Sequence, residues 1–190
     1  MPVPILDRPG RVDQLWPLTV DAYHALGEAG LIPEKTELLY GFVFHKMPKS
    51  PIHTQFVELL VEWLCAAIRS GMIVRQEQPL SLQGSEPEPD LAAVSGQRSD
   101  FYHSHPSTAQ LVIEVAVTTQ DYDRDKAAAY AGAGIPEFWI VLVPERQIEV
   151  YRDPQAGAYQ NITTISVGAV LSSSAVPGFE VTLSDLFAAR

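Results

Sequence analysis

Apolar residues recur at helical spacing in two long stretches of the chain. Across residues 52–69 they fall three and four positions apart, with Gly71 just beyond, which predicts an amphipathic helix. A second helix is predicted over residues 118–131, between two threonines that can cap it and two glycines that can end it. A shorter helix is expected over residues 19–26, with Thr19 as its cap.

Short apolar runs rich in β-branched residues predict strands. They cover residues 37–47, 72–82, 90–94, 111–117, 137–143 and 147–151, with weaker strands over residues 159–182 and a last short helix over residues 183–189. This mixture predicts an α/β fold in which helices flank a mixed sheet. Residues 1–17 contain four prolines and are expected to form an N-terminal arm, followed by a single domain over residues 18–190.

One charged residue interrupts the most apolar of these strands. Glu114 lies within the run Leu-Val-Ile-Glu-Val-Ala-Val of residues 111–117, on the strand face opposite to Ile113 and Val115. A buried carboxylate is unfavourable unless a cation or a hydrogen-bond donor compensates it. Asp90 opens another apolar strand directly after a proline, and Lys126 lies on the second predicted helix.

Convergence of these three side chains at one end of the sheet would form a site for a hard divalent cation. Carboxylate oxygens suit magnesium or manganese, and such a cation can activate a water and neutralise a phosphate. A purely structural role of the same residues is the alternative to this metal site. Glu114 and Lys126 can form an internal salt bridge, while Asp90 caps a turn.

Composition and charge restrict the class of protein. The apolar fraction of 46% and the charged fraction of 19% are typical of a globular protein, and no apolar stretch is long enough to span a membrane. Acids outnumber bases by 23 to 13, which argues against a protein that coats nucleic acid nonspecifically. The N-terminus lacks the pattern of a secretory signal, and the single cysteine, Cys65, is expected to be buried in a reducing cytoplasm.

The order of motifs resembles the Uma family, restriction endonucleases of bacteria within the PD-(D/E)XK nuclease superfamily. The resemblance covers residues 37–151. Its motifs are Pro-Asp at residues 89–90, LVIEV at 111–115, DRDK at 123–126, YAGAGIPEFWIV at 130–141 and VYR at 150–152. It implies a restriction-endonuclease-like core and metal-dependent hydrolysis of DNA phosphodiester bonds in the cytoplasm.

The resemblance also implies roles for individual residues. Asp90 and Glu114 match the metal-binding acids, and Glu37 matches an upstream acid of the same site. Lys126 matches a lysine that has moved to the helix, because Ala116 stands where the superfamily usually has its lysine. The implied cofactor is Mg²⁺ or Mn²⁺, and the implied partners are double-stranded DNA and a second copy of the chain. Two further residues, His53 and Tyr130, are candidates for contacting the substrate.

Departures from the family pattern keep other functions open. The family often has ELIDGE where this chain has ELLYGF, so Tyr40 and Phe42 replace acidic residues. This loss and the acidic charge balance favour a non-catalytic binding or regulatory module that kept the nuclease fold. The intact set of Asp90, Glu114 and Lys126 favours the enzyme. A metal-dependent hydrolase of a small phosphoester is a third alternative.

Overall fold

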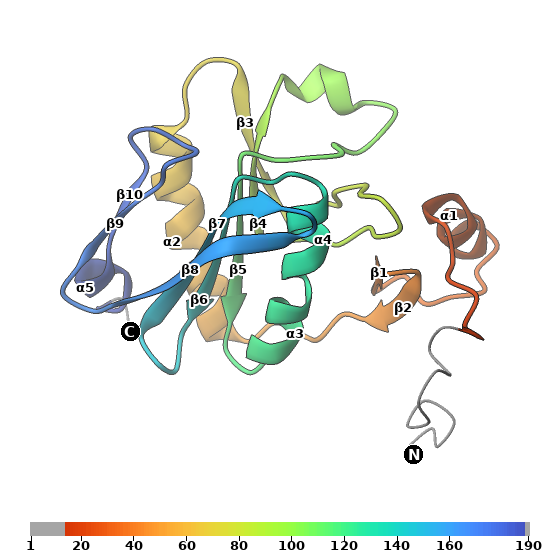
Figure 1. Ribbon diagram of the computed structural model, residues 1–190, viewed down its shortest axis with the longest axis horizontal. Coiled ribbons are helices and arrows are strands. Elements are labelled where there is room, and N and C mark those ends of the chain that lie inside the picture. Colours follow the sequence, from red (N-terminus) through yellow and green to blue (C-terminus); the bar gives the residue numbers. More distant parts are fainter. Residues whose placement is uncertain (1–13, 189–190) are drawn as a thin grey trace.

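The computed structural model describes residues 14–188, which are arranged around a six-stranded mixed sheet (Figure 1). Its strands, in spatial order, are β3 (Met72–Gln76), β4 (Leu91–Ser95), β5 (Leu111–Ala116), β6 (Glu137–Leu142), β7 (Gln147–Gln155) and β8 (Ala158–Ser166). Only β5 and β6 are parallel, and the helices α3 (Gln120–Asp125) and α4 (Ala127–Gly132) connect them. All the other neighbouring pairs are antiparallel.

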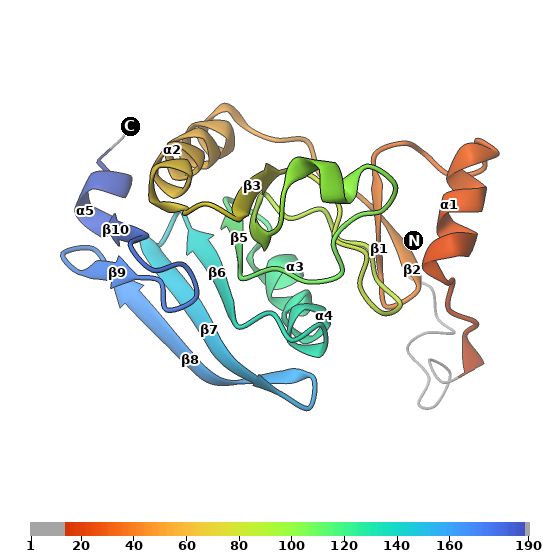
Figure 2. The same ribbon diagram turned by 90° about the horizontal axis from the view of Figure 1, so that it is seen from above.

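Helices cover both faces of the sheet. Figure 2 shows α2 (Pro51–Ala67) on one side and α3 and α4 on the other. The alternation along β5 follows this division, because Ile113 and Val115 pack in the core beneath α2 whereas Val112 and Ala116 pack in the core beneath α4. Glu114 therefore lies on the α4 side, as its position in the strand predicts.

The long helix α2 forms for local reasons that the sequence displays. The Ser50 hydroxyl accepts a hydrogen bond from the His53 N–H, and Pro51 occupies the first turn, where its missing N–H has no cost. One face buries four apolar side chains, Phe56, Val57, Leu60 and Leu64. Cys65, in contrast, is exposed, so the expectation that it is buried is wrong.

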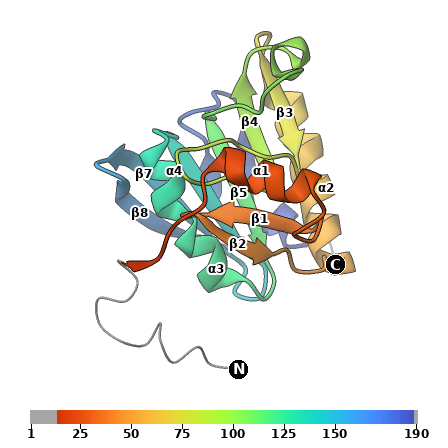
Figure 3. The same ribbon diagram turned by 90° about the vertical axis from the view of Figure 1, so that its right-hand side faces the viewer.

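A hairpin stands beside the sheet, at the end where Asp90 and Glu114 lie. It consists of β1 (Thr36–Leu39) and β2 (Phe42–His45), joined by Tyr40 and Gly41, both at positive φ, as the tight turn of a hairpin requires. Leu38 exchanges two backbone hydrogen bonds with Glu86, which attaches the hairpin to the segment leading into β4. In Figure 3, α1 (Val20–Glu28) crosses in front of this hairpin.

The second predicted helix is divided at Lys126, and a tyrosine from the hairpin explains the division. The Tyr40 hydroxyl donates to the Asp125 carbonyl at 2.5 Å and accepts from the Ala129 N–H at 3.1 Å. These are the two groups that would bond to each other in a continuous helix, so the hydroxyl is inserted into the helical ladder. Lys126 lies at the break between α3 and α4.

The remaining elements contribute to both sides of the core. They are the 3-10 helix η2 (Arg98–Phe101), the strands β9 (Val170–Ser172) and β10 (Glu180–Thr182), and the helix α5 (Leu183–Leu186). The predicted α/β fold with a mixed sheet is confirmed. Most of the predicted arm, residues 1–13, lies outside the described residues. None of the helices in residues 14–188 has the length and apolar character needed to cross a membrane.

Candidate active site

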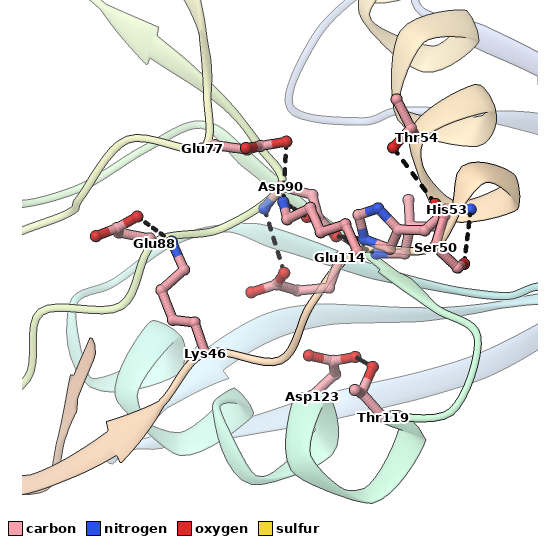
Figure 4. Close-up of polar contacts among 12 residues, drawn as sticks. Lys46, Ser50, His53, Thr54, Glu77, Glu88, Asp90, Glu114, Thr119 and Asp123 are labelled. Atoms are coloured by element: carbon pink, nitrogen blue, oxygen red, sulfur yellow. Dashed lines mark hydrogen bonds and ion pairs between the residues drawn. The ribbon is translucent and has the colours of Figure 1, made fainter. Parts of the chain in front are cut away.

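A cavity of about 170 Å³ opens where the hairpin, the start of α2 and the start of α3 meet the sheet. The titratable side chains in its wall come from five acids, three lysines, a histidine and a tyrosine: Glu37, Glu88, Asp90, Glu114, Asp123, Lys46, Lys49, Lys126, His53 and Tyr122. Figure 4 shows Asp90 and Glu114 close together, with His53 approaching from α2 and Asp123 from α3. Five of the six predicted site residues therefore line one cavity: Glu37, His53, Asp90, Glu114 and Lys126.

Asp90 is held by donors from three directions. It lies one residue before β4 and is almost fully buried. Its Oδ1 accepts a hydrogen bond from Lys49 Nζ at 2.8 Å, and its Oδ2 accepts one from the Val115 N–H at 2.8 Å. His53 Nε2 lies 3.0 Å from the same Oδ2. The carboxylate is thus fixed between the loop before α2 and the backbone of β5.

Glu114 reaches the cavity from the middle of the sheet. Its Oε1 accepts hydrogen bonds from the Tyr130 hydroxyl at 2.8 Å and from Lys126 Nζ at 3.0 Å. Its Oε2 accepts a hydrogen bond from the Asp90 N–H at 3.2 Å. The backbone amide of one acid therefore orients the side chain of the other, because β4 and β5 are neighbours.

Lys126 is shared by three carboxylates. Besides Glu114, its Nζ lies 3.3 Å from Glu37 Oε1 and 3.6 Å from Asp123 Oδ1. The ammonium also lies 5.1 Å from the ring centroid of Tyr122, whose hydroxyl donates to Glu37 at 2.8 Å. The lysine is buried, and its position at the break between α3 and α4 directs its side chain to these acids.

The two central acids differ in proton affinity. Burial alone would raise the pKa of Asp90, but the hydrogen bond from His53 and the charge of Lys49 outweigh it and hold that pKa well below its ordinary value. Burial raises the pKa of Glu114, and the opposing charge of Lys126 does not cancel this effect.

Lys126 itself remains charged. Burial would lower its pKa, but Glu114, Glu37 and Asp123 together reverse the direction and raise the pKa well above its ordinary value. One ammonium among three acids leaves an excess of negative charge. Burial is the main cause that raises the pKa of Asp123, and the charges of Asp90 and Glu37 add to it.

The two candidates for substrate contact occupy different environments. His53 lines the cavity, and its Nδ1 is buried without a hydrogen-bond partner among the described residues. Tyr130 is fully buried and does not line the cavity. Its hydroxyl donates to Glu114, so its position is that of a residue that orients this acid.

Sequence reasoning missed three residues of the site. Lys49 carries no signal in the sequence, yet its Nζ bridges Asp90 and, at 2.9 Å, Glu77. The other two are Asp123 and Tyr122, which line the cavity beside Lys126. The signal available for Asp123 was its spacing, three residues before Lys126 on the same helical face.

The donor set fits a hard divalent cation in chemistry and charge. Five carboxylates face three lysines across the cavity, and oxygen ligands are those that Mg²⁺ and Mn²⁺ prefer. Among residues 14–188, no three His, Cys, Asp or Glu side chains already stand in the arrangement of metal ligands. The lysines explain this, because the ammonium groups of Lys49 and Lys126 lie against the carboxylates.

Comparisons with known proteins agree with the fold and the motifs. The model of the Uma2 family, described as "Putative restriction endonuclease", matches residues 21–184. The fold is similar to the crystal structure of "a putative nuclease belonging to DUF820" from Anabaena variabilis, with a TM-score of 0.74. That similarity covers 91% of this chain and 99% of the other, at 16% sequence identity. No curated protein matches significantly. Because the family match spans most of its length, the chain belongs to the Uma2 family.

Proposed function

We propose that the protein is a metal-dependent endonuclease that hydrolyses phosphodiester bonds of double-stranded DNA. The observation that carries the proposal is the meeting of Asp90, Glu114 and Lys126 in one cavity, with Lys126 Nζ 3.0 Å from Glu114. Membership of a family described as restriction endonucleases supports the class of reaction.

The residues have distinct roles in this proposal. Asp90, Glu114 and Glu37 would hold Mg²⁺ or Mn²⁺, which would supply Lewis-acid chemistry for phosphate hydrolysis and for activating a water. Lys126 donates a hydrogen bond that orients the attacking water and offsets the charge that develops on the phosphate. His53 keeps Asp90 in position and presents its ring to the substrate side of the cavity.

A non-catalytic nuclease-fold module is the second candidate. The pairing of Lys49 with Asp90 and of Lys126 with Glu114 favours it, because these pairs compensate the acids without a cation. The two candidates predict different effects of divalent cations. The enzyme binds them and cuts DNA, whereas the module does not cut DNA with any divalent cation.

Plasmid cleavage tests the choice. Wild-type protein with Mg²⁺ or Mn²⁺ should nick or linearise the plasmid, and Glu114→Gln should reduce the rate by about 100-fold or more. Lys126→Ala should abolish cleavage while calorimetry still detects metal binding. Glu180→Gln is the matched control, because Glu180 is an exposed acid that does not line the cavity. This variant should cut at the wild-type rate. Metal binding without cleavage in any condition would favour the non-catalytic module.

We further infer that the enzyme acts on cytoplasmic DNA as a homodimer, because cutting both strands of a duplex usually takes two active sites. Sedimentation velocity with and without DNA should detect the dimer. Linear plasmid should form without prior accumulation of nicked circles. A monomer that only nicks would exclude this assembly.

A further inference from the structure

Arg75 is a buried cation without an acidic partner. It lies on β3 and is only 7% exposed, yet no carboxylate within the described residues forms an ion pair with it. Burial lowers the pKa of Arg75, and no neighbouring acid opposes this effect. Such isolation is unexpected in a chain with 23 acids and 13 bases, since buried charges are normally paired.

The hydrogen bonds of this guanidinium leave donor capacity unused. Nη2 donates to His105 Nδ1 at 3.1 Å and, at the long distance of 3.5 Å, to the Pro79 carbonyl. Nε is buried without a partner among the described residues. The guanidinium carbon lies 5.5 Å from the centroid of the Phe101 ring, which supports the flat face of the group but accepts no proton.

A separate cavity of about 330 Å³ opens beside Arg75. Its wall consists of Ile73, Val74, Arg75, Gln78, Arg98, Phe101 and Tyr102 and includes no acid. The nearest acid in η2, Asp100, is turned to its own backbone, where Oδ2 accepts the Gln97 N–H at 2.8 Å. Two arginines and a glutamine therefore line this cavity, and no carboxylate lines it with them.

We propose that this cavity binds a phosphate-type oxyanion, with Arg75 as the buried anchor and Arg98 as the second cation. The planar fork of an arginine donates two parallel hydrogen bonds to such a group, and its charge is strongest where water is excluded. Gln78 supplies a further donor. A tetrahedral oxyanion has enough oxygens to accept from all three side chains.

The position of the cavity gives two sources for the oxyanion. Two residues after Arg75, the Glu77 N–H donates to the Asp90 carbonyl at 3.1 Å, and the Glu77 carboxylate pairs with Lys49. Two residues of strand span about 7 Å, so the backbone of Arg75 lies about that far from the backbone of Glu77. The oxyanion is either a backbone phosphate of DNA, which rests on the proposed function, or the phosphate of a free nucleotide.

Inorganic phosphate is the first probe, without any metal. Thermal unfolding of the wild-type protein in about 20 mM phosphate, against chloride at equal ionic strength, should show a rise in Tm of several degrees. Arg75→Met should remove this rise while remaining folded in chloride, because an apolar side chain can replace an unpaired buried charge. Arg98→Gln should weaken phosphate binding by about 10-fold. Arg69→Gln, at an exposed arginine outside the cavity, is the control and should respond like wild type.

Two further probes distinguish the sources. In a Glu114→Gln background, Arg75→Met and Arg98→Gln should both weaken binding of a DNA duplex if the oxyanion is a backbone phosphate. If the variants bind a deoxynucleoside monophosphate more weakly than the parent protein does but bind DNA equally well, the site binds a free nucleotide. If neither phosphate, nucleotide nor DNA distinguishes them from the parent protein, the proposal is wrong. If Arg75→Met fails to fold, the same binding measurements on Arg98→Gln alone test whether the cavity binds the oxyanion. Failure of plasmid cleavage would not affect the phosphate result.

Discussion

At the level of single residues, the carboxylates of the candidate site outnumber the cations that touch them. Lys126 forms ion pairs with Glu114, Glu37 and Asp123, and the Tyr130 hydroxyl donates a hydrogen bond to Glu114. Such a cluster is stable only while its ammonium is present, because buried acids without compensation repel one another and lose hydration.

Lys126→Met should therefore destabilise the protein by about 3–5 kcal/mol at neutral pH, the usual effect of removing one partner from a buried charge cluster. Urea unfolding measures this loss. Magnesium should restore part of it if the cation binds the same acids. Lys35→Met, at an exposed lysine, should leave the stability within about 0.5 kcal/mol of wild type. Equal stability of Lys126→Met and wild type would mean that water, not lysine, compensates Glu114.

Glu137 is an acid of the GIPEFWIV motif with a structural role. It is completely buried, and its Oε1 receives hydrogen bonds from Trp139 at 2.9 Å and from Arg152 at 2.6 Å. Its Oε2 accepts the Ser173 hydroxyl at 2.7 Å and the Ala175 N–H at 3.0 Å. Burial would raise the pKa of Glu137, but these donors outweigh it and lower the pKa below its ordinary value of 4.5.

The sign of this shift predicts a pH dependence of stability. A carboxyl with a lowered pKa in the folded state stabilises the fold above about pH 4.5, and this contribution is lost as the pH falls through the lowered value. Glu137→Gln should lower the free energy of unfolding by about 1–3 kcal/mol at pH 7. The difference from wild type should shrink as the pH falls below about 4.5. Urea titrations at several pH values measure it, and a difference that stays constant with pH would contradict this role.

Single residues differ in how far the sequence reveals them. The apolar run around Glu114 predicts a buried acid that needs a partner, and the distance to Lys126 bears this out. The contact of Lys49 with Asp90 depends on where the loop before α2 lies relative to β4. No local pattern encodes that arrangement, so Lys49 could not be distinguished from a solvated base.

At the level of elements, the hairpin and the broken helix act together. The hydroxyl of Tyr40 bonds to Asp125 and Ala129, which are 85 and 89 positions away in the chain. A continuous helix was expected over residues 118–131 because the local pattern of apolar and polar residues is helical throughout. The insertion of a distant side chain has no signature in that pattern, so the break could not be predicted.

Tyr40→Phe tests this coupling, because it keeps the ring but removes the inserted hydroxyl. We expect a loss of about 1 kcal/mol in the free energy of unfolding, as for one net hydrogen bond. The Ala129 amide should bond directly to Asp125, closing the helix and shifting Lys126. Amide exchange and backbone chemical shifts of residues 125–129 measure the change. Val43→Thr, on the same hairpin, is a control that should leave these shifts unchanged.

At the level of the whole molecule, the formal charge of −10 bears on DNA binding. A protein with few cationic contacts to phosphates releases few counterions, so its affinity falls only weakly with salt. The catalytically impaired variant Glu114→Gln allows DNA binding to be measured without cleavage. For its association constant K with DNA, the slope of log K against log salt concentration should be about −3 or shallower. Fluorescence anisotropy at two salt concentrations measures the slope. A steep slope would reveal a continuous basic surface that the composition argues against.

The inserted tyrosine has a consequence for exchanging parts between relatives of this protein. A segment of residues 120–132 from a relative with an unbroken helix would carry its lysine at a different rotation about the helix axis, since each residue turns the helix by about 100°. The transplanted lysine would then miss the acids even though every residue type was conserved. A chimaeric protein should therefore take the hairpin turn at Tyr40 and the segment that carries the lysine from the same parent.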